Sequence, residues 1–279
     1  MVSFSFICPV CGQPLDREEN TLRCKTGHSF DRARSGYVNL LLSGGKHAKI
    51  PGDNKQMVLS RRAFLEKGFY RPMADALCRE TAEELNGLSS PAVLDAGCGE
   101  GYYTALLYQA LTDAGMKPRL LGIDISKFAA EKAAKHFSGN DEVQIGAASI
   151  FHMPVAEKSC DAVVTLFAPF CREEFLRVLK PGGLFVMVIP GARHLFGLKK
   201  AIYDQPYLNE VGDYAIEGME FLRSVPVDGE IHLEGGEIMR LFEMTPYYYK
   251  TSAEGQARAA ALRALTTETS FEILLYRKK

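Results

Sequence analysis

The sequence predicts an α/β protein built on a doubly wound, Rossmann-like parallel sheet, with a small metal-binding module at the N-terminus. Three observations predict this fold. Short apolar runs alternate with amphipathic segments from residue 92 onward, a glycine-rich turn follows the first run, and four cysteine or histidine residues lie near the start of the chain. The 279 residues, 47% of them hydrophobic and 24% charged, are enough for one large domain and a small module.

The N-terminal module is predicted from four potential metal ligands. Cys8 and Cys11 form a Cys-x2-Cys pair, and Cys24 and His28 form a Cys-x3-His pair on a second segment. Two such pairs can converge into a closed tetrahedral Zn²⁺ site, which predicts a structural zinc because no coordination position stays open. Redox thiols and a catalytic metal are the alternatives, and a disulfide is disfavoured because nothing indicates an oxidising compartment. Zinc should supply the folding energy of so small a module.

Two domains follow from this division of the chain. We expect the zinc-binding module to span residues 1–45 and the larger domain to span 46–279, joined by a polar loop over 43–54 that holds three glycines and one proline. Residues 55–86 have a helical pattern with a pause at 68–72.

Alternating patterns continue through the larger domain. We expect strands near 92–96, 119–124, 142–147, 161–167 and 184–189, and helices near 102–114, 127–137 and 171–180. Lys180–Gly183 should form a turn before the fifth strand. Ligands in such a sheet lie beyond the carboxyl ends of the strands.

The last third of the chain is less regular. Residues 191–250 are expected to form an irregular substrate region with helices over 193–203 and 235–242. Three adjacent tyrosines at 247–249 favour a strand edge or core position over base stacking. An alanine-rich helix over 253–265 and a final antiparallel strand over 271–276 complete the prediction.

The glycine-rich turn indicates the cofactor. The first apolar run ends at Asp95, and Gly97, Gly99 and Gly101 follow at alternate positions before a helical pattern begins. A dinucleotide site would place its third glycine one residue later. The pattern D-x-G-x-G-x-G favours S-adenosylmethionine (SAM) instead, with backbone and ligand in close approach. Asp124 ends the second run, where an acid is expected to accept both ribose hydroxyls.

Charge and hydropathy restrict the partners. The net charge is −1, yet residues 1–62 hold ten Lys or Arg and five Asp or Glu, which suits a polyanion-binding segment if the asymmetry is not chance. No apolar run is long enough to span a bilayer and no secretory signal is visible, so we expect a cytoplasmic protein with no membrane partner.

Several motifs together make the chain resemble the bacterial 23S rRNA guanine-N1 methyltransferases, which are SAM-dependent. The glycine motif is typical of the whole methyltransferase superfamily, whereas the remaining motifs are more specific. They are the Cys/His pattern, Gly36-Tyr37-Val38-Asn39-Leu40, Arg61-Arg62-Ala63-Phe64-Leu65, Gly68-Phe69-Tyr70, Pro190-Gly191-Ala192-Arg193-His194-Leu195 and Met244-Thr245-Pro246.

The resemblance implies methylation of guanine N1 in a domain II hairpin of 23S rRNA by a homodimer. It also implies cofactor contacts from Tyr70, Gly101, Tyr102 and His194. Ser149 follows the third strand, where many methyltransferases have an aspartate that contacts adenine, and it is the expected replacement.

The residues after the fourth strand bear on the chemistry. Ala168-Pro169-Phe170 replaces the Asn/Asp-Pro-Pro-Tyr of amino-methylating enzymes, which is consistent with methylation of a ring nitrogen. Phe167 or Phe170 is a candidate to stack a flipped-out guanine, and no side chain is identified as the acceptor of the N1 proton. Two alternatives remain: a small-molecule methyltransferase with a structural zinc knuckle, and a non-enzymatic zinc-binding RNA adaptor.

Overall fold

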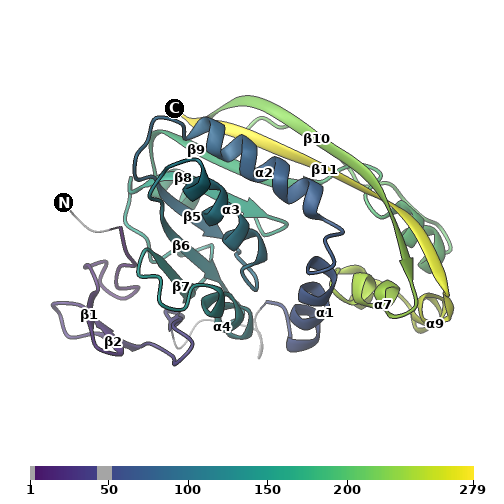
Figure 1. The fold of residues 1–279 in the computed structure, drawn as a ribbon, viewed down its shortest axis with the longest axis horizontal. Helices are drawn as coiled ribbons and strands as arrows, with labels where there is room; N and C mark the ends of the chain where they lie inside the picture. The colour runs from purple at the N-terminus through teal and green to yellow at the C-terminus, as the bar shows by residue number, and fades with distance from the viewer. Residues whose placement is uncertain (1–3, 43–51) are drawn as a thin grey trace.

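The computed structural model describes residues 4–42 and 52–279 (Figure 1). The expected domain boundary after residue 45, and most of the expected loop over 43–54, lie outside the described residues. The N-terminal module contains a small antiparallel sheet of β1 (Asp16–Glu18), β2 (Thr21–Arg23) and β3 (Ser29–Asp31). The next strand, β4 (Val38–Asn39), pairs in parallel with β7 (Val143–Ala147) and so belongs to the main sheet.

The main sheet has the order β10-β11-β9-β8-β5-β6-β7-β4. The remaining strands are β5 (Ala92–Ala96), β6 (Arg119–Asp124), β8 (Cys160–Leu166), β9 (Leu179–Pro190), β10 (Met219–Glu234) and β11 (Ala264–Lys278). The strands from β9 to β4 are parallel, and β11 and β10 are antiparallel additions. Chain order reverses between β5 and β8, which is the switch point where doubly wound sheets bind ligands.

Helices cover both faces of the sheet. Figure 1 shows α2 (Arg71–Glu84) and α3 (Tyr102–Asp113) side by side across one face, with α4 (Lys127–His136) near β7. The other face packs against α5 (Arg172–Val178) and the N-terminal module. Neighbouring residues of β5 face opposite cores, Val93 toward α2 to α4 and Leu94 toward α5, which is why this strand is apolar up to Asp95 and buried throughout.

A second group of helices lies beside the extended ends of β10 and β11. They are α1 (Lys55–Leu65), α6 (Phe196–Ile202), α7 (Gly236–Glu243), α8 (Tyr247–Lys250) and α9 (Ala253–Ala261). Helix α1 lies against α7, where Glu243 accepts hydrogen bonds from Gln56 (3.0 Å) and Ser60 (2.5 Å). Strands β10 and β11, which pair with each other and join the main sheet through β9, attach this group of helices to the main sheet.

The structure corrects several expected elements. Lys180–Gly183 lies within β9 as an irregularity in the pairing with β8, because the register shifts between Cys160 and Ala162. The helix expected over 253–265 ends at Ala261, because residues 264–278 pair with β10 over their whole length. The tyrosines at 247–249 form the short helix α8 and no strand edge. Strand β10 was not expected at all, and the helix expected to begin at residue 193 begins at Phe196.

Candidate functional site

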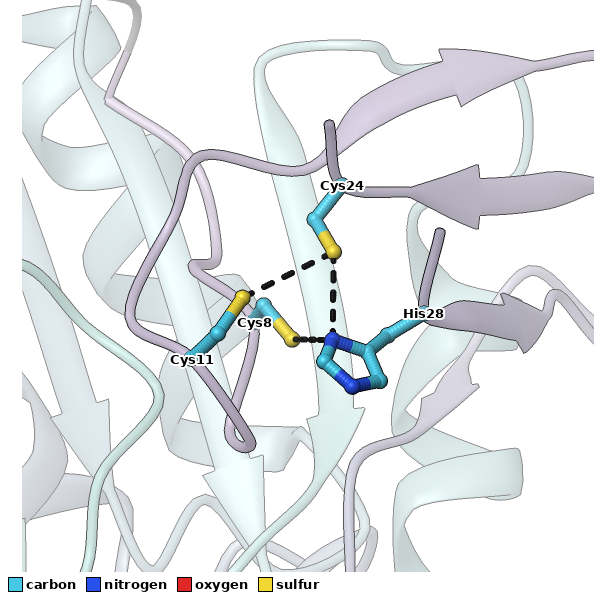
Figure 2. A group of neighbouring side chains, drawn as sticks. All are labelled: Cys8, Cys11, Cys24 and His28. Carbon is cyan, nitrogen blue, oxygen red and sulfur yellow. Dashed lines mark hydrogen bonds between the residues drawn. The ribbon is translucent and has the colours of Figure 1, made fainter. Parts of the chain in front are cut away.

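The four predicted metal ligands converge in the N-terminal module. Their ligand atoms all lie within 4.8 Å of one another. The Nδ1 atom of His28 lies 3.6 Å from Cys8 Sγ and 3.4 Å from Cys24 Sγ, and the sulfurs of Cys11 and Cys24 are 3.6 Å apart (Figure 2). Tetrahedral zinc with ordinary bond lengths separates such ligands by roughly 3.5–3.8 Å. The donor set and its spacing therefore fit a closed structural zinc site.

The backbone forms this cluster from two tight turns. Gly12 (φ +71°) donates to the carbonyl of Cys8 at 2.8 Å, and Gly27 (φ +92°) donates to that of Cys24 at 2.9 Å. Each turn needs a left-handed residue, which glycine supplies without strain. The Thr26 hydroxyl, which the sequence analysis did not single out, lies 3.1 Å from Cys11 Sγ and 3.0 Å from Cys24 Sγ.

The electrostatics at Cys24 favour metal binding. Burial raises the pKa of the Cys24 thiol, but hydrogen bonds with Thr26, Cys11 and His28 outweigh it and lower that pKa to about 6. A thiol with a lowered pKa is more readily present as the thiolate that binds zinc.

A cavity of about 400 Å³ lies at the switch point between β5 and β8. Its lining includes five of the nine residues expected at the cofactor site, namely Gly97, Gly99, Tyr102, Asp124 and Ser149. The other four, Tyr70, Asp95, Gly101 and His194, are not part of the lining. The volume falls within the range of small-molecule sites.

The three glycines of the turn have different neighbours. A Cβ at Gly97 would lie 2.6 Å from Ala168 Cβ at the end of β8, and one at Gly101 would lie 2.8 Å from Ala133 Cα of α4. A Cβ at Gly99 would meet nothing within 4 Å. Gly97 and Gly101 are thus required by packing of the fold, and Gly99 leaves open space at the cavity wall.

Two carboxylates support the turn. The Asp124 carboxylate accepts hydrogen bonds from the backbone N–H groups of Gly99 (3.0 Å) and Ser126 (2.8 Å), which leaves lone pairs for ribose hydroxyls. Asp95 is buried behind the turn and accepts from the Thr104 hydroxyl at 2.6 Å. Its Oδ1 atom is buried without a hydrogen-bond partner among the described residues. Burial raises the pKa of Asp95 to about 7, with a further contribution from Asp124.

Tyr70 and His194, which were expected to contact the cofactor, do not line the cavity. They contact each other, with Tyr70 Oη 3.2 Å from His194 Nε2, and both pack on Phe271. The Ser270 backbone N–H donates to His194 Nδ1 at 3.3 Å, which assigns the proton of a neutral imidazole to Nε2. Burial lowers the pKa of His194 to about 3, so this histidine is neutral.

The two phenylalanines considered for base stacking have similar exposure, with Phe170 at 41%, but only Phe167 lines the cavity. Phe167 lines the cavity, is 47% exposed and has a left-handed φ of +55°. Phe170 is not part of the lining, and its ring packs on Phe175 and Phe185 with centroid distances of 5.6 and 6.0 Å. A bulky residue with positive φ is uncommon, and such strained residues cluster at functional sites and in turns.

Other residues of the lining were not predicted as site residues. Arg61 extends from α1, forms an ion pair with Asp53 and donates to the Met244 carbonyl at 3.1 Å. Ile125 and Phe151 add apolar surface next to Asp124 and Ser149. The sequence could have indicated these two residues as part of the site, because they follow the carboxyl ends of β6 and β7.

Among the described residues, no helix has both the length and the apolar character needed to cross a bilayer.

Comparison with known proteins agrees with this geometry. Residues 6–49 match the zinc-ribbon family described as "RlmA, N-terminal", and residues 89–244 match the family described as "Methyltransferase domain". A solved structure, YjhP from E. coli, is similar in fold with a TM-score of 0.50 at 16% identity, covering 81% of this chain and 100% of that one.

Two relatives are similar in sequence. The chain is 33% identical to a putative 23S rRNA (guanine-N(1)-)-methyltransferase of Micromonospora griseorubida, over 94% of this chain and 93% of the relative. It is 34% identical to the 23S rRNA (guanine(748)-N(1))-methyltransferase of Streptomyces fradiae, over 70% and 66%. Together with the zinc cluster and the cavity at the switch point, this similarity shows that the chain belongs to the SAM-dependent 23S rRNA (guanine-N1)-methyltransferase family.

Proposed function

We propose that this protein transfers a methyl group from SAM to N1 of a guanine in a domain II hairpin of 23S rRNA. The observation that carries the proposal is the cavity at the switch point, where the glycine turn, Asp124 and the exposed ring of Phe167 form one lining. Relatives with 33% and 34% identity are named for this reaction.

The cavity lining offers groups for each part of the cofactor. SAM supplies an electrophilic methyl group on a sulfonium, and transfer of that methyl group leaves a neutral thioether. The backbone at Gly99 is open to the amino-acid end, and Asp124 has lone pairs free for the ribose hydroxyls. Ile125 and Ser149 lie beside the position proposed for adenine. In this proposal, four of the expected residues lie outside the cavity lining and hold the turn and the adjoining loops in place. They are Tyr70, Asp95, Gly101 and His194.

Phe167 is the proposed platform for the target base. A base inside a helical stem is out of reach, so the guanine must leave its stack and rest on another surface. An exposed aromatic ring at the cavity provides that surface, and the left-handed backbone at Phe167 directs the ring there at a cost in strain. Holding N1 in line with the methyl group then supplies much of the rate enhancement.

The N1 proton is assigned to solvent in this proposal. Each carboxylate among the described lining residues already has a partner. Asp53 pairs with Arg61, and Glu100 lies 3.5 Å from His136 Nε2. Asp124 accepts from the backbone, and its remaining lone pairs are assigned to the ribose hydroxyls. His194 is neutral, but its Nδ1 already accepts a hydrogen bond and it lies outside the lining.

The proposal includes the setting of the reaction. The N-terminal module, residues 1–45, is proposed to contact the rRNA, and the protein is proposed to act in the cytoplasm as a homodimer, as its family resemblance implies. Sedimentation of the purified protein tests the dimer directly.

Incubation with radiolabelled SAM and either total RNA or ribosomes tests the reaction. Label recovered as N1-methylguanine in 23S rRNA is the expected result, whereas label in small metabolites or no transfer would refute the proposal. Phe167→Ala should reduce kcat/KM for rRNA by roughly 10- to 100-fold, the range of one base–aromatic stack, while SAM affinity stays unchanged. Phe170→Ala is the matched control, and an equal loss in both variants would refute the role of Phe167.

A further inference from the structure

Phe151 is the most exposed large apolar side chain in the described residues, at 61%. It lies on the loop over residues 148–155 that follows β7, and it lines the same cavity as Phe167. The SAM-binding groups and the target-base platform do not account for a second exposed phenylalanine at this cavity. Exposed apolar rings at a binding cavity indicate a surface that a ligand covers.

The loop that carries Phe151 is held firmly in place. The Phe151 N–H donates to Ser149 Oγ (3.2 Å), and the Met153 N–H donates to the carboxylate of Glu174 (2.6 Å). Arg177 donates to the carbonyls of Met153 (2.8 Å) and Val155 (2.6 Å). The exposure of Phe151 is therefore a property of a well-anchored backbone.

The same loop contacts the zinc-binding module. The Ile7 N–H, adjacent to the ligand Cys8, donates to the Pro154 carbonyl at 2.9 Å. Phe6 is fully buried against β7, since a Cβ at Gly146 would lie 3.0 Å from its ring. Phe151 thus stands on a loop that reaches the zinc module at one end and the cavity at the other.

We propose that Phe151 stacks a second base of the rRNA, the neighbour of the guanine that rests on Phe167. This inference rests on the proposed function. A guanine that leaves its stack exposes the faces of adjoining bases, and single-stranded RNA is commonly bound by stacking such bases on aromatic side chains. The adenine of SAM is the competing occupant, but Ile125 and the largely buried Ile150 already supply apolar walls beside Asp124 and Ser149.

The test compares RNA and cofactor binding in the full-length zinc-loaded protein. The probe is a 23S rRNA domain II transcript, titrated in the presence of S-adenosylhomocysteine, and SAM affinity is measured separately by calorimetry. Phe151→Ala should weaken RNA binding about tenfold or more and leave SAM affinity unchanged. Phe151→Tyr should retain binding because it keeps the aromatic face. Phe221→Ala is the matched control, since Phe221 is also exposed (42%) but lies on β10 outside the cavity lining.

The outcomes separate this inference from the proposed function. Weaker SAM binding by Phe151→Ala would assign the ring to the cofactor and overturn the inference. Unchanged RNA affinity in a variant whose parent methylates rRNA normally would also overturn it and leave the proposed function standing. Failure of the parent to methylate rRNA would overturn both.

Discussion

The glycine turn allows a matched pair of substitutions, Gly97→Ala and Gly99→Ala. Both residues have a left-handed φ, +91° and +56°, so an alanine costs about 1–2 kcal/mol of stability at either position. Only Gly97 has a close neighbour, because its Cβ would lie 2.6 Å from Ala168 Cβ, well inside the ~3.5–4.0 Å of a carbon contact.

The expected magnitudes follow from this difference. The end of β8 must move by about 1 Å to accept Gly97→Ala, and overpacking of this kind costs a further ~1–3 kcal/mol. We therefore expect a loss of about 2–5 kcal/mol for Gly97→Ala and about 1–2 kcal/mol for Gly99→Ala. The methyl group at position 99 should instead enter the space proposed for SAM and weaken its binding by an order of magnitude or more.

Urea denaturation measures the first effect, and calorimetric titration of SAM measures the second. Equal unfolding midpoints for the two variants would show that Ala168 does not constrain Gly97. Wild-type SAM affinity in Gly99→Ala would show that the cofactor does not lie against the turn, and the proposed placement would then be wrong.

Two further predictions concern the zinc cluster and the buried acid. Cys24→Ser should lower both zinc content and SAM affinity, because the Ile7–Pro154 hydrogen bond joins the zinc module to the cavity loop, whereas Cys171→Ser should change neither. Wild-type SAM affinity in a zinc-free Cys24→Ser protein would contradict this coupling. The pKa of Asp95, raised to about 7, should make the cofactor-free protein less stable as pH rises from about 4 to 7, by at most ~1.4 kcal/mol per pH unit. Asp95→Asn should remove this slope in urea denaturation at pH 5 and 7, and an unchanged slope would assign it to another group.

The zinc ligands and the parallel strands could be predicted because their signals are local. Each metal-binding pair lies within five consecutive residues, so the turn that joins the pair already brings its side chains together. Strands β5 to β8 face a core on both sides, and their mostly apolar sequences therefore predict buried strands.

Strand β10 could not be predicted in the same way. Most of its residues are exposed or half-buried and it contains Pro226, so no apolar run or regular alternation distinguishes it. Its conformation comes from pairing with β11 over residues 219–234. Because of the same pairing, residues 264–265 lie in β11 and not in the alanine-rich helix that the sequence predicts there.

The sequence by itself determined the metal ligands, the glycine turn and the alternation that makes a doubly wound sheet, because each is recognised from residues close together in the chain. It also indicated Asp124 by its place at the end of an apolar run, although the contact between Asp124 and Gly99 joins distant segments. Only the tertiary structure placed Phe167 in the cavity lining and Phe170 outside it, since the two residues are three positions apart and equally apolar. The left-handed backbone at Phe167 directs one ring to the cavity, while Phe175 and Phe185 pack against the other. Tyr70 and His194 meet because α2 and the end of β9 pack against Phe271, and contacts between such distant segments leave no local pattern to read.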